Sequence, residues 1–280
     1  MALVRGRGLA SHLLGRAVLQ AAVRVLEARA IPVMPLKGIW LQQVVYADPG
    51  DRLITDVDVL IPDDRYEETL DVLRAAGWSM RGSNVSEAAL LSPDLPLLLD
   101  VHRRLFTRGA FRMPSSELFA RGGRDRKLYE VEVVLPDPRD VFAHLVGHFV
   151  KSRGGRDTQS HELRDLPALA VRFAFEPAAT ARHLERCGLG RASRYALQFV
   201  SRKDDPTGFC AATVECLRND VVGDCCAATM LRLRSRYSAQ SALAALPGFV
   251  LDDSLPRGLS SLALRVWDRR SHKRLGETGG

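Results

Sequence analysis

Residues 53 to 61 constrain the fold more than any other part of the chain, because two aspartates stand inside a run rich in β-branched side chains. Turn-forming residues flank this run at 48–50 and 62–64, so the pattern predicts a β-strand. Side chains alternate between the faces of a strand, so Asp56 and Asp58 should project from the same side. Their charges repel unless a cation lies between them, and Mg²⁺ prefers such hard oxygen ligands.

A third carboxylate, Asp100, lies in a second apolar run at 95–101, which also predicts a strand. If the two strands are neighbours, three carboxylates can hold two cations about 3.5 to 4 Å apart, as in two-metal phosphoryl transfer. The alternative is that Asp56 and Asp58 form only the polar face of a half-exposed strand, which is what an isolated Asp-x-Asp usually means.

A possible phosphate-binding turn precedes these strands. An apolar run at 33–36 ends in Lys37-Gly38, and apolar residues then recur with helical spacing to residue 46. Glycine lets a phosphate approach the backbone, and the free amides at a helix N-terminus favour an anion. Lys37 would add a charged contact. Alternatively, Gly38 only relieves crowding at a tight turn and Lys37 is only solvated.

Four motifs follow one another in the first half of the chain: Leu36-Lys37-Gly38, Tyr46-x-Asp48-Pro49-Gly50-x-Arg52, Asp56-Val57-Asp58-Val59-Leu60 and Asp100-Val101-His102. Over roughly residues 20 to 150, this series resembles an uncharacterised nucleotidyltransferase family within the polymerase β-type superfamily. The resemblance implies a mixed β-sheet with flanking helices. It also implies a glycine turn that holds a nucleoside triphosphate and a carboxylate pair on the next strand, with a third carboxylate on a later one.

The same resemblance implies roles for individual residues. Asp56, Asp58 and Asp100 would be the catalytic carboxylates and the ligands of Mg²⁺, with two ions expected and Mn²⁺ as an alternative; Asp100 is also the candidate general base. The nucleotide-binding set would comprise Gly38 at the turn together with Lys37, Arg52 and His102.

Several of these roles have alternatives. Arg52 would contact phosphate, brace its loop or lie on the surface, and His102 would touch substrate, order Asp100 or be structural. Many superfamily members carry Gly-Ser at the turn, whereas this chain has Gly38-Ile39. Lys37 is the candidate replacement for the missing hydroxyl.

The pattern changes after Pro136 to apolar residues at helical spacing. We therefore predict an α+β protein with a nucleotidyltransferase-like catalytic domain at 1–135, including an N-terminal helix, and a mainly α-helical domain at 136–280. The resemblance implies that these later helices form the acceptor side. His144 and His148 share a helix face, as an interface or pocket pair or, alternatively, as metal ligands. A loop is predicted at 151–159 and a frayed tail at 269–280.

Composition favours a cytoplasmic enzyme. No uninterrupted apolar run is long enough to span a bilayer, and residues 9–26 predict an amphipathic helix, with an organellar transit peptide as the alternative. The net charge of +7 favours polyanion contact without selecting the polyanion. Five cysteines, none with Cys-x-x-Cys spacing, predict reduced thiols, with Cys225 and Cys226 buried on a helix.

The resulting hypothesis is a magnesium-dependent nucleotidyltransferase. It would move a nucleoside monophosphate from a triphosphate, such as ATP, to a hydroxyl or phosphate of an acceptor, which is a small molecule, a peptide or RNA. No membrane partner and no DNA sequence recognition are expected. The alternatives are a catalytically inactive nucleotide- or RNA-binding protein of the same fold, and a toxin-like transferase that modifies tRNA or protein.

Overall fold

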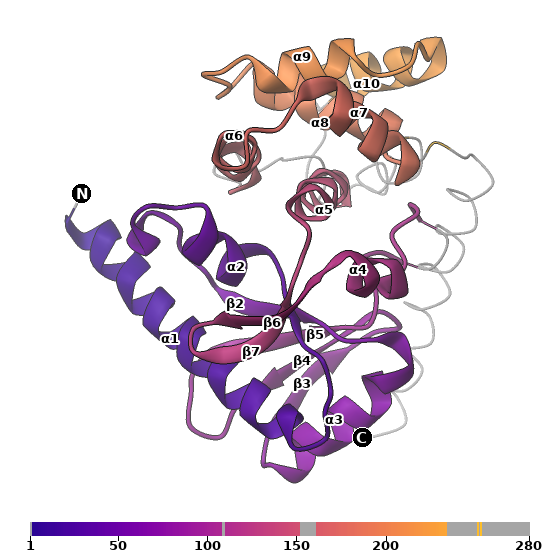
Figure 1. The fold of residues 1–280 in the computed structure, drawn as a ribbon. Coiled ribbons are helices and arrows are strands. Elements are labelled where there is room, and N and C mark those ends of the chain that lie inside the picture. Colours follow the sequence, from indigo (N-terminus) through magenta and orange to yellow (C-terminus); the bar gives the residue numbers. More distant parts are fainter. Residues whose placement is uncertain (1, 108–109, 152–160, 234–250, 252, 254–280) are drawn as a thin grey trace. The chain divides into compact units, whose positions relative to one another are not determined.

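The computed structural model describes residues 2–107, 110–151, 161–233, 251 and 253 (Figure 1). The chain divides into two compact units. Unit 1 comprises Met1–Leu105 and Met113–Val141, and unit 2 comprises Phe106–Arg112 and Phe142–Gly280.

Unit 1 is built on a mixed five-stranded sheet, as the sequence predicts. Its spatial order is β1 (Met34–Pro35), β2 (Asp56–Leu60), β5 (Leu98–His102), β4 (Glu87–Leu91) and β3 (Ser79–Ser83). The central pair, β2 and β5, is parallel, whereas every other neighbouring pair in this sheet is antiparallel. The two predicted carboxylate-bearing strands are therefore direct neighbours.

Helices and a hairpin surround this sheet. They are α1 (Ala2–Glu27), α2 (Lys37–Val44), α3 (Tyr66–Ala75), α4 (Ser115–Arg121) and the hairpin of β6 (Gly123–Leu128) and β7 (Val131–Leu135), with short 3₁₀ turns at Pro49–Asp51 and Asp63–Arg65. The hairpin joins the residues before β1, because Val134 N–H donates to the Val33 carbonyl at 2.9 Å. The strand, turn and helix predicted around Gly38 are present as β1 and α2.

The core of unit 1 explains the alternation along its strands. Val57 and Val59 of β2 and Leu99 and Val101 of β5 are fully buried, and they alternate with the carboxylates. Each buried aliphatic side chain of this size contributes about 1.5 to 3 kcal/mol to folding. Helix α1 packs against α3 and contacts both β2 and β5. The apolar residues therefore fix which face of the sheet the carboxylates occupy.

Helix α1 differs from the expectation in one respect. Residues Gly6–Glu27 are long and apolar enough, by length and composition, to cross a membrane. The core helix of a soluble protein and a signal sequence pass the same test, and 44% of the apolar window is buried within the fold. The prediction concerned uninterrupted apolar runs, and this helix reaches the threshold as an average over a segment that contains arginines.

Unit 2 is helical in its described part, as the periodicity after Pro136 predicts. Its helices are α5 (Pro138–Lys151), which begins in unit 1, followed by α6 (Glu162–Arg172), α7 (Pro177–Arg186), α8 (Gly190–Ser201), α9 (Phe209–Glu215) and α10 (Val221–Leu233). Helix α8 packs against α9 and α10. Apart from Lys151, the loop predicted at 151–159 lies outside the described residues. The tail predicted at 269–280 also lies outside them.

All five cysteines are free thiols. Cys187 and Cys210 are buried, Cys216 and Cys225 are exposed, and Cys226 is half-buried. The expected burial of the adjacent pair was wrong, because the exposed side of α10 carries Cys225.

Candidate active site

The turn between β1 and α2 brings Lys37 to the carboxylates. Lys37 adopts a left-handed conformation (φ +44°), which is uncommon for a residue with a side chain, and Leu36 N–H donates to the Asp58 carbonyl at 2.9 Å. From this position Lys37 Nζ lies 2.6 Å from Asp58 Oδ1. The ammonium group of Lys37 therefore faces a carboxylate. The alternative reading of the sequence, that Lys37 is only solvated, does not hold.

The packing around Gly38 explains why this position has no side chain. A Cβ at residue 38 would lie 2.5 Å from Ile54 Cγ2 and 3.3 Å from Arg52 Nη1. Gly38 has no positive φ, so the requirement is for space. Close packing alone accounts for the glycine, and phosphate binding at this turn stays a prediction.

The segment around Asp48 forms a braced turn before β2. Asp48 Oδ1 accepts a hydrogen bond from Gly50 N–H at 2.8 Å, and Gln42 Nε2 donates to the Arg52 carbonyl. Arg52 is 8% exposed, and its Nη1 donates to the Leu53 carbonyl. This geometry fits the reading that Arg52 braces its loop, and its contact with phosphate stays a prediction.

The register of β2 and β5 brings the three carboxylates together. Asp58 pairs directly with Asp100, and Asp56 pairs with Leu98 two residues earlier. Side chains at directly paired positions point to the same face of a sheet, so Asp100 lies beside Asp58 and on its side. Asp58 is buried, whereas Asp56 and Asp100 are half-buried. Exposure thus differs within a single cluster.

The three carboxylates also differ electrostatically. Burial alone would raise the pKa of Asp58, but the charge of Lys37 and a hydrogen bond to His102 outweigh it and hold this pKa far below its usual range. Burial, together with the charges of Asp58 and Asp56, raises the pKa of Asp100 to about 6. Burial and then the charge of Asp58 raise the pKa of Asp56. Of the three carboxylates, only Asp58 has a pKa that is lowered overall.

His102 occupies a different environment from the one expected for a nucleotide-binding residue. Its Nε2 lies 2.8 Å from Asp58 Oδ1, and its Nδ1 lies 3.0 Å from Glu87 Oε2. The ring is 4% exposed. Burial would lower the pKa of His102, but the hydrogen bond to Asp58 and the nearby Glu87 carboxylate raise it. One expectation from the sequence was that His102 orders Asp100, whereas the ring contacts Asp58.

Glu87 is the residue that sequence reasoning missed. It lies on β4 and pairs with His102 across the antiparallel β4–β5 ladder, and the Glu87 side chain is 32% exposed. The signal that would have found it is weak. Residues 87–91 include only one polar position, and nothing in the sequence specifies that β4 lies beside β5.

The residues at this site fit a divalent cation. One oxygen of Asp100, Oδ1, is buried and has no hydrogen-bond partner among the described residues, and a buried polar atom of this kind needs an explanation. The available donors are carboxylate oxygens, which suit Mg²⁺ and Mn²⁺. The charges of Asp58 and Asp56 also raise the pKa of Asp100. A cation held by Asp56, Asp58 and Asp100 would relieve both the repulsion and the unpaired oxygen.

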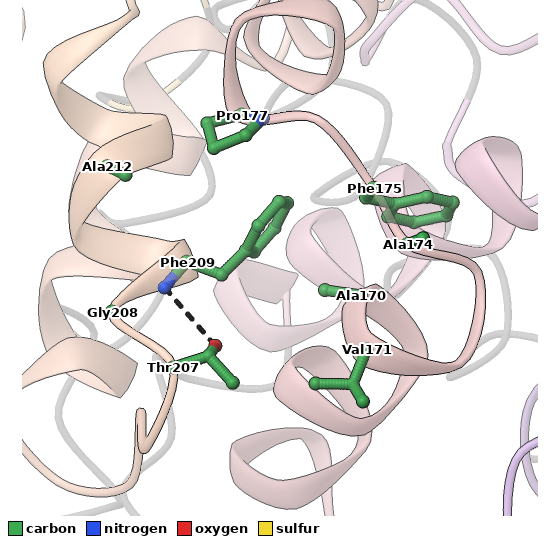
Figure 2. Close-up of a pocket in the computed structure, with 9 residues that line it drawn as sticks. All are labelled: Ala170, Val171, Ala174, Phe175, Pro177, Thr207, Gly208, Phe209 and Ala212. Carbon is green, nitrogen blue, oxygen red and sulfur yellow. Dashed lines mark hydrogen bonds between the residues drawn. The ribbon is translucent and has the colours of Figure 1, made fainter.

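Unit 2 contains its own surface features. A mainly apolar pocket of about 290 Å³ lies between α6, the start of α7 and α9, and Figure 2 shows the Phe209 ring projecting into it. His144 and His148 contact each other edge to face, with ring centroids 6.2 Å apart. His144 also contacts Phe106 in the same way. These ring contacts support a packing role for the pair, whereas metal binding by it stays a prediction.

Comparison with known proteins gives one family and several distant structures. The model of a family described as uncharacterised nucleotidyltransferases matches residues 11–202. No curated protein matches the sequence. Distantly similar solved structures include the antibiotic-resistance factor ANT(2'')-Ia in solution, at 12% identity over 67% of this chain and 96% of that chain, with a TM-score of 0.45.

Two further structures show similar values. A crystal structure of ANT(2'')-Ia in complex with adenylyl-2''-tobramycin has 10% identity over 61% of this chain and 94% of that chain, with a TM-score of 0.45. An antigenic nucleotidyltransferase-like protein from Paracoccidioides brasiliensis has 14% identity over 71% of this chain and 93% of that chain, with a TM-score of 0.44. Assignment to a family rests on the match at residues 11–202.

Proposed function

Because the chain belongs to this uncharacterised nucleotidyltransferase family, we propose that it transfers a nucleoside monophosphate from a triphosphate, ATP being the expected donor, to a hydroxyl or phosphate acceptor. The observation that carries the proposal is the β2–β5 register, which sets Asp58 beside Asp100 and leaves Asp56 on the same face. Three carboxylates converging in this way are typical of metal-dependent phosphoryl transfer.

In this proposal each residue has a defined task. Asp56, Asp58 and Asp100 hold Mg²⁺ or Mn²⁺, which, when bound, would neutralise charge on the triphosphate and activate the attacking oxygen. Asp100 is also the candidate general base, as the resemblance to the family implies. The Gly38 turn and Arg52 belong to the triphosphate side, and the helices after residue 136 to the acceptor side.

The reaction balances as a single displacement. The acceptor hydroxyl loses its proton to the base, and its oxygen forms a bond to the α-phosphorus. The bond between that phosphorus and the bridging oxygen breaks, and pyrophosphate leaves with the electron pair. A phosphate acceptor would react in the same way through one of its oxygens, without the need for a base.

The acceptor class can be found with labelled donors. Purified protein would be incubated with each α-³²P nucleoside triphosphate, Mg²⁺ or Mn²⁺ and a cell extract separated afterwards into small molecules, protein and RNA. We expect label in one fraction together with pyrophosphate release, and neither with Asp100→Asn. Label in RNA or protein would favour the toxin-like alternative, and equal turnover by Asp100→Asn would refute the proposed site.

One observation favours a second candidate, a nucleotide-binding protein without transfer activity. Lys37 and His102 both contact Oδ1 of Asp58, so one oxygen of the central carboxylate is already engaged. This candidate predicts that a fluorescent nucleotide analogue binds while no pyrophosphate appears with any triphosphate. A burst of pyrophosphate with any donor and extract would exclude it.

A further inference from the structure

Asp58 is held at one oxygen and open at the other. Lys37 Nζ and His102 Nε2 both contact Oδ1, at 2.6 and 2.8 Å. Among the described residues, no hydrogen bond to Asp58 Oδ2 is found. The two oxygens of a carboxylate are part of one rigid group. Because Lys37 and His102 fix Oδ1, they also set the direction in which Oδ2 points.

His102 is in turn contacted by Glu87 on the side of the ring away from Asp58. Its ring lies between two carboxylates on different strands, with Asp58 on β2 at Nε2 and Glu87 on β4 at Nδ1, 3.0 Å away. Ionised carboxylates only accept hydrogen bonds, so Asp58 and Glu87 each favour a proton on the ring nitrogen that faces them. Flanked in this way on both sides, the ring is held in one rotation by Glu87.

The sheet explains why this chain of contacts is rigid. Glu87 pairs directly with His102 in the β4–β5 ladder, and Asp100 pairs directly with Asp58 in the β5–β2 ladder. All four positions therefore lie on regular backbone of three adjacent strands. Groups that hold a metal ligand from behind affect metal affinity strongly, typically by 10- to 100-fold.

We propose that Glu87 and His102 are positioning residues that orient the Asp58 carboxylate for a divalent cation. This inference rests on the proposed function, because it takes Asp58 to be a ligand. It differs from the nucleotide-binding role predicted for His102, since neither ring nitrogen is left to contact a nucleotide. Glu87 acts through His102 and does not itself touch the cation or substrate.

Mn²⁺ binding tests the proposal without any turnover. The dissociation constant would be measured by titrating Mn²⁺ and following free ion by electron paramagnetic resonance, on the wild type, Glu87→Asp and Glu87→Gln. Glu87→Asp keeps the charge but withdraws the carboxylate by one methylene, which breaks its contact with Nδ1. We expect both variants to bind Mn²⁺ about 10-fold or more weakly than the wild type, with unchanged thermal unfolding temperatures.

A matched control separates this effect from loss of charge. Glu132→Gln removes one negative charge from an exposed position on β7 and should leave the dissociation constant unchanged. If Glu87→Asp binds Mn²⁺ as tightly as the wild type while Glu87→Gln binds weakly, Glu87 acts only through its charge and the positioning role is overturned.

A double-mutant cycle gives the second test. In a His102→Asn background, Glu87→Gln should have no further effect on the dissociation constant, because its route to Asp58 is gone. An undiminished additional loss would overturn the proposal. If His102→Asn fails to fold, the Mn²⁺ dissociation constant of Glu87→Asp still decides the question.

The two proposals fail in distinguishable ways. A wild type that binds Mn²⁺ and transfers nucleotide, with Glu87→Asp unaffected, removes only the positioning role. A wild type that binds no Mn²⁺ removes the proposed metal site and this inference together.

Discussion

Replacing Asp100 by asparagine should stabilise the metal-free protein while abolishing its metal binding. Asp100 has one buried oxygen without a hydrogen-bond partner among the described residues, and it lies beside Asp58 and near Asp56. Its ionised form is therefore unfavourable in the folded state. Asparagine has almost the same shape and no charge, so the substitution removes the repulsion.

The magnitude follows from the raised pKa. A rise from 3.8 to about 6 corresponds to about 3 kcal/mol of penalty on the ionised form. Asp100 is half-buried, and solvent screens part of that penalty. We therefore expect Asp100→Asn to raise the free energy of unfolding by about 1 to 2 kcal/mol at pH 8 in the presence of EDTA.

The dependence on pH has a definite sign. The carboxyl group ionises near pH 4 in the unfolded chain but only near pH 6 in the folded protein, so wild-type stability falls as pH rises from about 4 to 6. Below pH 4 the Asp100 carboxyl is protonated in both the folded and the unfolded chain. The difference in free energy of unfolding between wild type and Asp100→Asn should then vanish. Urea denaturation in EDTA at pH 4, 6 and 8 measures this.

Asp58→Asn should behave in the opposite way. It would leave Lys37 and His102 without their carboxylate partner, and breaking a buried ion pair costs about 3 to 5 kcal/mol. Saturating Mn²⁺ should stabilise the wild type and neither variant. An Asp100→Asn protein that is less stable than wild type at pH 8 in EDTA would refute the reasoning, since it would show that the Asp100 carboxylate is favourably paired.

Four further predictions concern packing and exposure. The Tyr66 hydroxyl is buried without a partner among the described residues, whereas the Tyr129 hydroxyl donates to a backbone carbonyl at 3.1 Å; in urea denaturation Tyr66→Phe should be neutral or stabilising and Tyr129→Phe should cost about 1 kcal/mol, and equal losses would contradict this. Burial raises the pKa of Tyr66 to about 12, so the Tyr66 hydroxyl should lower wild-type stability as pH rises from about 10 to 12, and this part of the fall should be absent in Tyr66→Phe. Gly38→Ala should cost about 1 to 3 kcal/mol because its Cβ meets Ile54, and this loss should shrink in an Ile54→Ala background; a cost-free Gly38→Ala would rule out the close packing. Cys216 and Cys225 are exposed, whereas Cys187 and Cys210 are buried. Under native conditions iodoacetamide should therefore label the two exposed thiols, as read by mass spectrometry, long before the two buried ones, which should react only in denaturant. Rapid labelling of either buried thiol would contradict the fold.

Local pattern was enough to predict much of the secondary structure. The strand at β2, the turn before α2 and the switch to helices after Pro136 each follow from spacing within about ten residues. Alternation along β2 likewise places Asp56 and Asp58 on one face. The strand ends were less predictable: β2 begins at Asp56 and β5 at Leu98, both later than the apolar runs suggest, because ladder pairing sets the limits.

Conformation and packing at single residues could not be predicted in the same way. Gly38 was read either as a site of close phosphate approach or as relief of crowding at a tight turn, and the structure shows Ile54 in the space that a side chain would occupy. Arg52 was read as a phosphate ligand or a brace, and its guanidinium donates to the Leu53 carbonyl of its own loop. The packing at Gly38 and the contact of Arg52 both depend on how the turn at 48–54 places its residues.

By itself, the sequence determined which residues alternate along each strand, and hence that two carboxylates share a face. Only the tertiary structure decided that β5 runs parallel to β2 in the register that sets Asp100 beside Asp58, and that β4 brings Glu87 to His102. The physical reason is that alternation is a local property of extended backbone, whereas strand neighbours and register result from burying apolar side chains across the whole sheet.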